Sequence, residues 1–208
     1  KKDLHDLMEE YGDERKTIFI DSSGKEEIIT DEDLIEEGQV VITVTQNGYI
    51  KQLPLETYKI QKRGGTGVRG ATVKEEDIIE RVFITSNMNT LLFFTNKGKI
   101  HWLKAFKVPE ASRYAKGTNL VNLLRLNSQE KVSTVLPIKD LEHDAYLLFA
   151  TKNGVVKKTH LCEFSNPRQG GIAALTLKSE DEVVQVTLSD GNMQFLLATR
   201  NGRAVKFH

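Results

Sequence analysis

The order of apolar and polar positions repeats along most of the chain. From residue 40 onward, an apolar run ends in Thr, passes through a short polar turn to Gly, and continues into a second, more basic segment. This pattern occurs four times and predicts four β-hairpins. The turn glycines, which lie 50, 56 and 48 residues apart, are Gly48, Gly98, Gly154 and Gly202.

The hairpin turns carry a strong local signal. Three of the four contain Asn-Gly, at Asn47, Asn153 and Asn201, and this pair predicts a type I′ turn because that turn requires φ > 0 at both central residues. Between the hairpins a further apolar segment recurs after acidic residues, at 78–83, 132–136 and 183–186. A period near 50 residues with several strands per unit predicts an all-β, propeller-like disk of blades.

The repeat also sets the expected domain organisation. We place the repeat units at about 40–89, 90–144 and 145–193, with the start of a fourth at 194–208. This is fewer blades than a complete disk, so we expect a truncated one. Apolar residues at helical spacing before Gly12 predict a short amphipathic helix. Residues 1–16 are interpreted as the end of an upstream helix and a linker, and 17–208 as the partial disk.

The formal net charge of zero conceals an uneven distribution. Residues 1–37 hold five basic and fourteen acidic side chains, a balance of −9, whereas residues 38–208 hold 24 basic and 15 acidic ones, a balance of +9. This asymmetry favours a basic binding body with an acidic lead-in. An acidic linker beside an ordinary protein surface would give the same charges.

A basic, glycine-bearing loop follows the turn glycine by fourteen or fifteen residues in each complete unit. Cations at one place per blade would follow one edge of the disk, and duplex DNA, with one charge per ~1.7 Å of axis, favours such a row. Glycines would let the duplex approach the main chain. Alternatively, these loops are polar connections that need glycine to turn. The three loops are Lys62–Gly65, Arg113–Gly117 and Arg168–Gly171.

The first loop resembles a known motif. Gln61-Lys62-Arg63-Gly64-Gly65-Thr66-Gly67 is similar to the gyrase A box, Gln-Arg-Arg-Gly-Gly-Lys-Gly, which marks the C-terminal domain of the DNA gyrase A family. Lys62 keeps the charge of the arginine it replaces, Thr66 loses that of a lysine, and Arg69 is placed to restore it. The segments 11–17 and 44–55 also resemble this family, and the similarity covers almost the entire chain.

The resemblance implies a β-pinwheel, a disk whose blades share strands with their neighbours and whose basic rim wraps duplex DNA without reading its sequence. It also implies membership of a type IIA topoisomerase that introduces negative supercoils with ATP. The implied partners are the gyrase B subunit together with a second copy of the A subunit. ATP and Mg would bind other domains, with no cofactor on this segment. The implied location is cytoplasmic and nucleoid-associated.

The DNA-binding candidates are the basic residues of the three loops, the rest of the box, and three lysines just past the hairpin turns. The lysines are weaker candidates because they are as easily solvated strand residues, and the box glycines and Thr66 are expected to shape the loop. The candidates are Gln61, Lys62, Arg63, Gly64, Gly65, Thr66, Gly67, Arg69, Arg113, Lys116, Arg168, Lys51, Lys157 and Lys158.

No catalytic constellation appears in the sequence. The five histidines and Cys162 lack metal-ligand spacing, and no phosphate-binding P-loop occurs. Cys162 is expected to be a buried structural residue, and no apolar run approaches the ~18 residues of a membrane span. Two alternatives remain: the related pinwheel of topoisomerase IV, on its A-type subunit, which favours decatenation, and a propeller that binds proteins. The latter often carries a Trp-Asp repeat, but the sole tryptophan, Trp102, precedes leucine.

Overall fold

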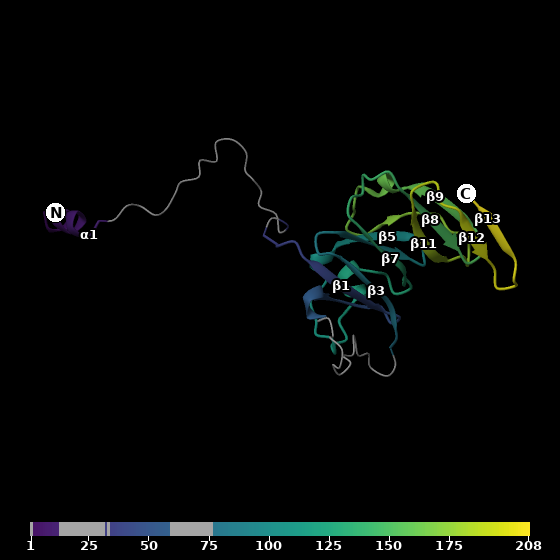
Figure 1. Ribbon diagram of the computed structural model, residues 1–208, viewed down its shortest axis with the longest axis horizontal. Helices are drawn as coiled ribbons and strands as arrows, with labels where there is room; N and C mark the ends of the chain where they lie inside the picture. Colours follow the sequence, from purple (N-terminus) through teal and green to yellow (C-terminus); the bar gives the residue numbers. More distant parts are fainter. Residues whose placement is uncertain (1, 13–31, 33, 59–76) are drawn as a thin grey trace, which may run out of the picture. The chain divides into compact units, whose positions relative to one another are not determined.

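The computed structural model describes residues 2–12, 32, 34–58 and 77–208 (Figure 1). The chain divides into two compact units, residues 1–36 and 37–208. The expected boundary at residue 16 lies outside the described residues. So do the box, Gln61 to Gly67, and Arg69.

The first unit contains the expected short helix, α1 (Lys2–Tyr11). The Gly12 amide donates to the Met8 carbonyl at 3.0 Å. A Cβ on residue 12 would lie 2.2 Å from that oxygen, so glycine suits the position that ends the helix. None of the described helices is long and apolar enough to cross a membrane.

The second unit is almost entirely β-structure, and its strands form four antiparallel sheets, which we number as blades 1 to 4. Blade 1 has the order β3-β1-β2-β6, blade 2 β10-β5-β4-β7, blade 3 β11-β8-β9 and blade 4 β12-β13. The predicted all-β blades are confirmed, and the sheets do not close into a ring. The strands are β1 (Gln39–Thr45), β2 (Tyr49–Pro54), β3 (Ile79–Ser86), β4 (Thr90–Thr95), β5 (Lys99–Lys104), β6 (Thr118–Asn119), β7 (Val132–Ile138), β8 (Tyr146–Thr151), β9 (Val156–His160), β10 (Ile172–Ala173), β11 (Val183–Ser189), β12 (Phe195–Ala198) and β13 (Ala204–Phe207).

Short helices join several of these strands. Three are single 3-10 turns directly after the hairpins of blades 1 to 3, and one is a short α-helix directly after β6. They are η1 (Leu55–Thr57), η2 (Ala105–Lys107), η3 (Leu161–Phe164) and α2 (Leu120–Leu124).

Neighbouring blades share strands, as the family resemblance implied. The two-residue strand β6 belongs to the second repeat but pairs with β2 of blade 1, with Thr118 opposite Ile50. In the same way β10, from the third repeat, pairs with β5 of blade 2, with Ile172 opposite Ile100. Each short strand therefore completes the outer side of the blade before its own.

The repeated Thr and Gly shape the hairpin turns. In blade 1 the Gly48 amide donates to the Thr45 carbonyl at 2.9 Å, and the Thr45 hydroxyl accepts from the Tyr49 amide at 3.1 Å. The predicted type I′ turn is wrong, because φ is positive at Gly48 but not at Asn47. Three loop residues rather than two connect the strands, which fits a type I turn followed by a left-handed glycine. The same two bonds recur at Thr95, Thr151 and Thr199.

The acidic residues before the third strand of each blade also have a structural role. Asp77 is buried and accepts a hydrogen bond from the Asn47 amide at 3.2 Å. Asp181, also buried, does the same for Asn153 at 3.0 Å. These carboxylates therefore hold the hairpin turns in place.

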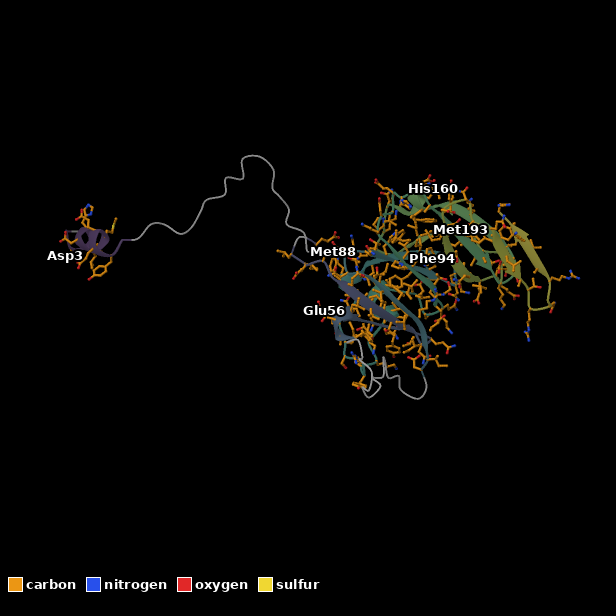
Figure 2. All side chains as sticks on the ribbon, in the orientation of Figure 1. Asp3, Glu56, Met88, Phe94, His160 and Met193 are labelled. Carbon is orange, nitrogen blue, oxygen red and sulfur yellow. The ribbon has the colours of Figure 1, made fainter. Side chains whose placement is uncertain are left out.

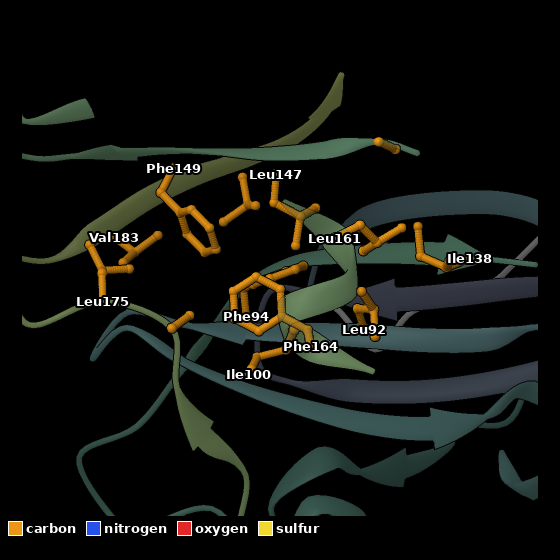
Figure 3. Packing of buried hydrophobic residues seen from close by; sticks show 13 residues of the cluster. Leu92, Phe94, Ile100, Ile138, Leu147, Phe149, Leu161, Phe164, Leu175 and Val183 are labelled. Atoms are coloured by element: carbon orange, nitrogen blue, oxygen red, sulfur yellow. The ribbon is translucent and has the colours of Figure 1, made fainter. Parts of the chain in front are cut away.

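The core fills the spaces between successive blades. Strand β4 is buried on both faces because Leu91 and Phe93 face blade 1 while Leu92 and Phe94 face blade 3. This explains its continuous apolar run, which an edge strand would not need. Figure 3 shows the second of these interfaces, where Phe94 meets Phe149 edge-on at 5.6 Å, and Figure 2 shows Phe94 deep among the packed side chains.

Candidate nucleic-acid interface

The second and third basic loops lead directly into the shared strands. Residues 112–117 precede β6 on the outer side of blade 1, and residues 168–171 precede β10 on the outer side of blade 2. Each loop therefore lies on the blade before the one that its repeat suggested. The equivalent placement follows from pairing, so both loops occupy the outer edge of a blade at corresponding positions.

The glycines of these loops are explained by contact with the neighbouring blade. Gly117 has φ 88° and a Cβ there would lie 2.5 Å from the Ile50 carbonyl oxygen. Gly171 has φ 72° and a Cβ would lie 2.7 Å from the Ile100 carbonyl oxygen. At these two positions glycine lets the loop approach a strand, whereas the sequence suggested an approach by DNA. Gly170, in contrast, has open space around it.

Lys51 supports the loop of blade 1 from below. It is only 4% exposed, and its Nζ donates to the carbonyl oxygens of Ser112, Arg113 and Ala115 at 3.2, 2.8 and 2.9 Å. Burial lowers the pKa of this ammonium. Lys51 was predicted as a weak DNA contact, and this is corrected: all its donors are used by the loop, which it shapes.

Arg113 and Lys116 lie on tyrosine rings at the edge of blade 1. The Arg113 guanidinium carbon is 4.8 Å from the centre of the Tyr58 ring, and Lys116 Nζ is 3.9 Å from that of Tyr49. Hydrogen bonding by Lys116 is the main cause that lowers the pKa of the Tyr49 hydroxyl. Such contacts hold long cationic side chains in place at low cost. Because Tyr58 precedes Gln61 by three residues, Arg113 lies beside the entrance to the box segment.

The remaining candidates lie on blades 2 and 3. Arg168 is exposed on the loop before β10. On β9, Lys157 donates to the Ala174 carbonyl at 2.9 Å, and Lys158 donates to the Gly191 carbonyl at 3.2 Å while lying over Tyr146 at 4.4 Å. Both β9 lysines are exposed, so these weak contacts leave them accessible.

Two cations outside the predicted set lie close to Arg168. Lys107 ends η2 and Arg125 follows α2, and with Arg168 they line a hollow of about 330 Å³. Neither residue belongs to the repeated loops, so the period of the sequence carried no signal for them. Only the left-handed backbone of Arg125, φ 53°, marks that position as unusual.

The described residues hold no group of three or more His, Cys, Asp or Glu side chains able to bind a metal ion. Cys162 is exposed rather than buried, contrary to the prediction. It lies on η3, where the neighbouring Leu161 and Phe164 supply the buried side chains instead. The chemistry on this surface is therefore that of fixed cations and backbone amides.

Comparison with known proteins decides the family. Residues 39–86, 89–139 and 145–190, one range for each complete repeat, match the family described as DNA gyrase C-terminal domain, beta-propeller. The chain belongs to this family. The resemblance drawn from the box is thereby confirmed from residues outside the box itself.

Relatives of the DNA gyrase C-terminal domain family are similar over the whole chain. It is 45% identical over 208 residues to the DNA gyrase A protein of Halalkalibacterium halodurans, covering 100% of this chain and 25% of that protein. It is 39% identical over 207 residues to the DNA gyrase A protein of Haemophilus influenzae, covering 100% of this chain and 23% of that protein. The chain thus spans about a quarter of the relatives it matches.

Solved structures of the same architecture are also similar. The C-terminal domain of DNA topoisomerase IV aligns with a TM-score of 0.70 and 30% identity, covering 83% of this chain and 52% of that one. A DNA gyrase A C-terminal domain aligns with a TM-score of 0.60 and 25% identity, covering 81% and 54%. Both confirm the pinwheel architecture.

Proposed function

We propose that the second unit binds duplex DNA along the outer edge of its blades and bends it. The observation that carries this proposal is the position of the basic loops. Lys116 on blade 1 and Arg168 on blade 2 occur in loops that enter the shared outer strands at equivalent places. Membership of the DNA gyrase C-terminal domain family supports the same conclusion.

The interface is suited to phosphates rather than to bases. Phosphate contacts orient a duplex but carry no sequence information, whereas base reading requires an element that enters a groove. The longest helix of the second unit that the structure describes has five residues, too short for a recognition helix. Binding should therefore be insensitive to sequence and strongly dependent on salt.

The whole protein's activity is part of the same proposal. We infer that this chain is the DNA-wrapping portion of the larger of the two DNA gyrase proteins, gyrase A, a type IIA topoisomerase component. In that enzyme the gyrase B subunit, with a second copy of gyrase A, would complete the assembly. ATP and Mg would bind outside this segment and supply negative supercoiling. A location in the cytoplasm at the nucleoid follows from the proposed DNA partner.

A second candidate is the corresponding domain of topoisomerase IV, which the 0.70 TM-score to such a domain favours. The relatives at 39–45% identity are DNA gyrase A proteins, so we place gyrase first. The two candidates differ in what the assembled enzyme does to DNA. A gyrase introduces negative supercoils into relaxed plasmid, whereas a topoisomerase IV mainly separates linked circles.

A linking-number assay tests the wrapping itself. Nicked plasmid is ligated in the presence of increasing amounts of the 208-residue chain, the protein is removed, and the topoisomers are compared. We expect a protein-dependent shift of one sign, because a chiral wrap constrains writhe. The double variant Lys62→Ala, Arg63→Ala in the box should lose the shift.

Two other outcomes would count against the proposal in different ways. Salt-sensitive binding without any shift in linking number would mean that the chain holds DNA without bending it. Absence of binding even at low salt would remove DNA as the partner and favour a protein-interaction role. Lys139→Gln is the control: this exposed lysine follows β7, at the opposite edge of blade 2 from β10, and should change nothing.

A further inference from the structure

A hollow on blade 2 gathers cations from three separate elements. It lies between β5, η2, the end of α2 and the loop before β10. Arg125 ends the segment that reaches back to blade 1, and Arg168 begins the segment that reaches back to blade 2. The hollow is therefore the place where two successive shared segments meet, with a volume of about 330 Å³.

The charges around this hollow have one sign. Lys107, Arg125 and Arg168 line it, and none of its lining residues is acidic. Within the part of the chain that the structure describes, Arg125 and Arg168 form no ion pair or hydrogen bond through their side chains. Three like charges near one concave surface repel one another, so an anion there would lower the energy of the site.

His101 gives an independent indication that the site is incomplete. It lines the same hollow, is 4% exposed, and its Nε2 has no hydrogen-bond partner among the described residues. Burial lowers the pKa of this imidazole, an effect that Glu130 opposes and Lys99 adds to. A neutral imidazole still carries one N–H that can donate to an oxygen. Buried polar atoms without partners are rare and commonly mark a ligand or water position.

The backbone of Arg125 is also unusual. It has φ 53° and ψ 47° at the C-cap of α2, a left-handed conformation that favours glycine or asparagine. Among the described residues the only other non-glycine residue with positive φ is Glu180. Glycine would suit the conformation better than arginine does, so the side chain rather than the backbone accounts for arginine at this position.

We propose that this hollow is a phosphate site, formed by Arg125, Arg168 and Lys107 over His101, which receives one phosphodiester group of the duplex. The inference rests on the proposed function and adds a contact outside the three basic loops. Guanidinium groups suit this role because their planar donors match phosphate oxygens in pairs. The site would fix the duplex at the junction of two blades, between the loops that hold Lys116 and Arg168.

Arg125→Gly is the decisive variant because it removes the charge without straining the fold. We expect its affinity for a 30-base-pair duplex to fall about 3- to 10-fold at low salt, and its slope of log K against log salt to become shallower by about 0.9. Its melting temperature should not fall, since glycine accepts the left-handed conformation. Arg125→Lys should keep most of the affinity, and Lys139→Gln should keep all of it.

A second measurement uses inorganic phosphate alone as the probe. Titration of the 208-residue chain is followed through the ring signals of His101 in long-range ¹H–¹⁵N NMR spectra. We expect a saturable shift that Arg125→Gly weakens. Duplex binding with unchanged affinity and salt slope in Arg125→Gly would overturn the inference while leaving the proposed function intact.

The two ideas can also fail separately in the other direction. If the unaltered chain bound no duplex, the proposed function would fail. The phosphate titration would then decide the hollow alone: a His101 shift lost in Arg125→Gly would retain an anion site there, and no shift would remove it.

Discussion

At the scale of single residues, lysines at one position of the repeat have different roles. Lys51 and Lys157 both lie three residues past the turn glycine. Lys51 is buried under three carbonyl oxygens, whereas Lys157 is exposed and donates to one. The difference arises because the loop of the following repeat covers Lys51.

Lys51→Met should therefore destabilise the fold. The variant leaves up to three loop carbonyls without their charged donor, which costs about 2–4 kcal/mol in total if water replaces part of the loss. Urea unfolding followed by circular dichroism measures the change. Lys157→Met is the matched control and should cost less than about 1 kcal/mol. Equal losses in the two variants would contradict the structural role, as would weaker DNA binding by Lys51→Met without any loss of stability.

Residue identities alone could not have separated these cases. The sequence places Lys51, Lys157 and Lys158 in similar basic strand segments, and burial is decided by a loop more than 60 residues away. The phosphate hollow is likewise invisible in the sequence, since Lys107, Arg125 and His101 belong to three different elements. Long-range packing creates both features, and a periodic pattern reports only local structure.

At the scale of elements, the hairpins were predictable and the shared strands were not. The hairpins carry strong local signals: apolar alternation, Thr before the turn and Gly at its end. Strands β6 and β10 contain two residues each and pair with partners about 70 residues earlier. Only the resemblance to the gyrase family indicated that strands would be exchanged. The turn type was mispredicted because Asn-Gly also suits a three-residue loop with one left-handed glycine.

Two adjacent glycines test how the shared strand of blade 2 is held. Gly171→Ala should destabilise the fold by about 2–3 kcal/mol, because alanine is strained at φ 72° and its Cβ would lie 2.7 Å from the Ile100 carbonyl oxygen. Gly170→Ala should be neutral or slightly stabilising, since open space surrounds it. Thermal unfolding of both variants measures the difference. A loss in Gly170→Ala as large as that in Gly171→Ala would show that the loop needs flexibility rather than close approach.

At the scale of the whole molecule, function depends on cations on successive blades. The net charge of zero would argue against a DNA partner, but the balance of +9 in residues 38–208 and the position of the loops reverse that argument. Bending 20–30 base pairs by 40–90° costs on the order of 1–6 kcal/mol. One exposed cation cannot offset that energy, so contacts on several blades have to act on the same duplex.

Wrapping should therefore be more sensitive than binding to the loss of one blade's contact. Arg168→Gln should make the salt slope shallower by about 0.9 and weaken binding modestly, because the other blades still hold phosphates. The linking-number shift should fall much further, since the duplex can leave the curved path between blade 1 and blade 3 once nothing holds it on blade 2. Both quantities are measured with the same chain at saturating protein, with Lys139→Gln as control. If saturating Arg168→Gln protein restored the full shift, the bend would be maintained by blades 1 and 3 alone, and the row of contacts would contribute affinity without dictating the path.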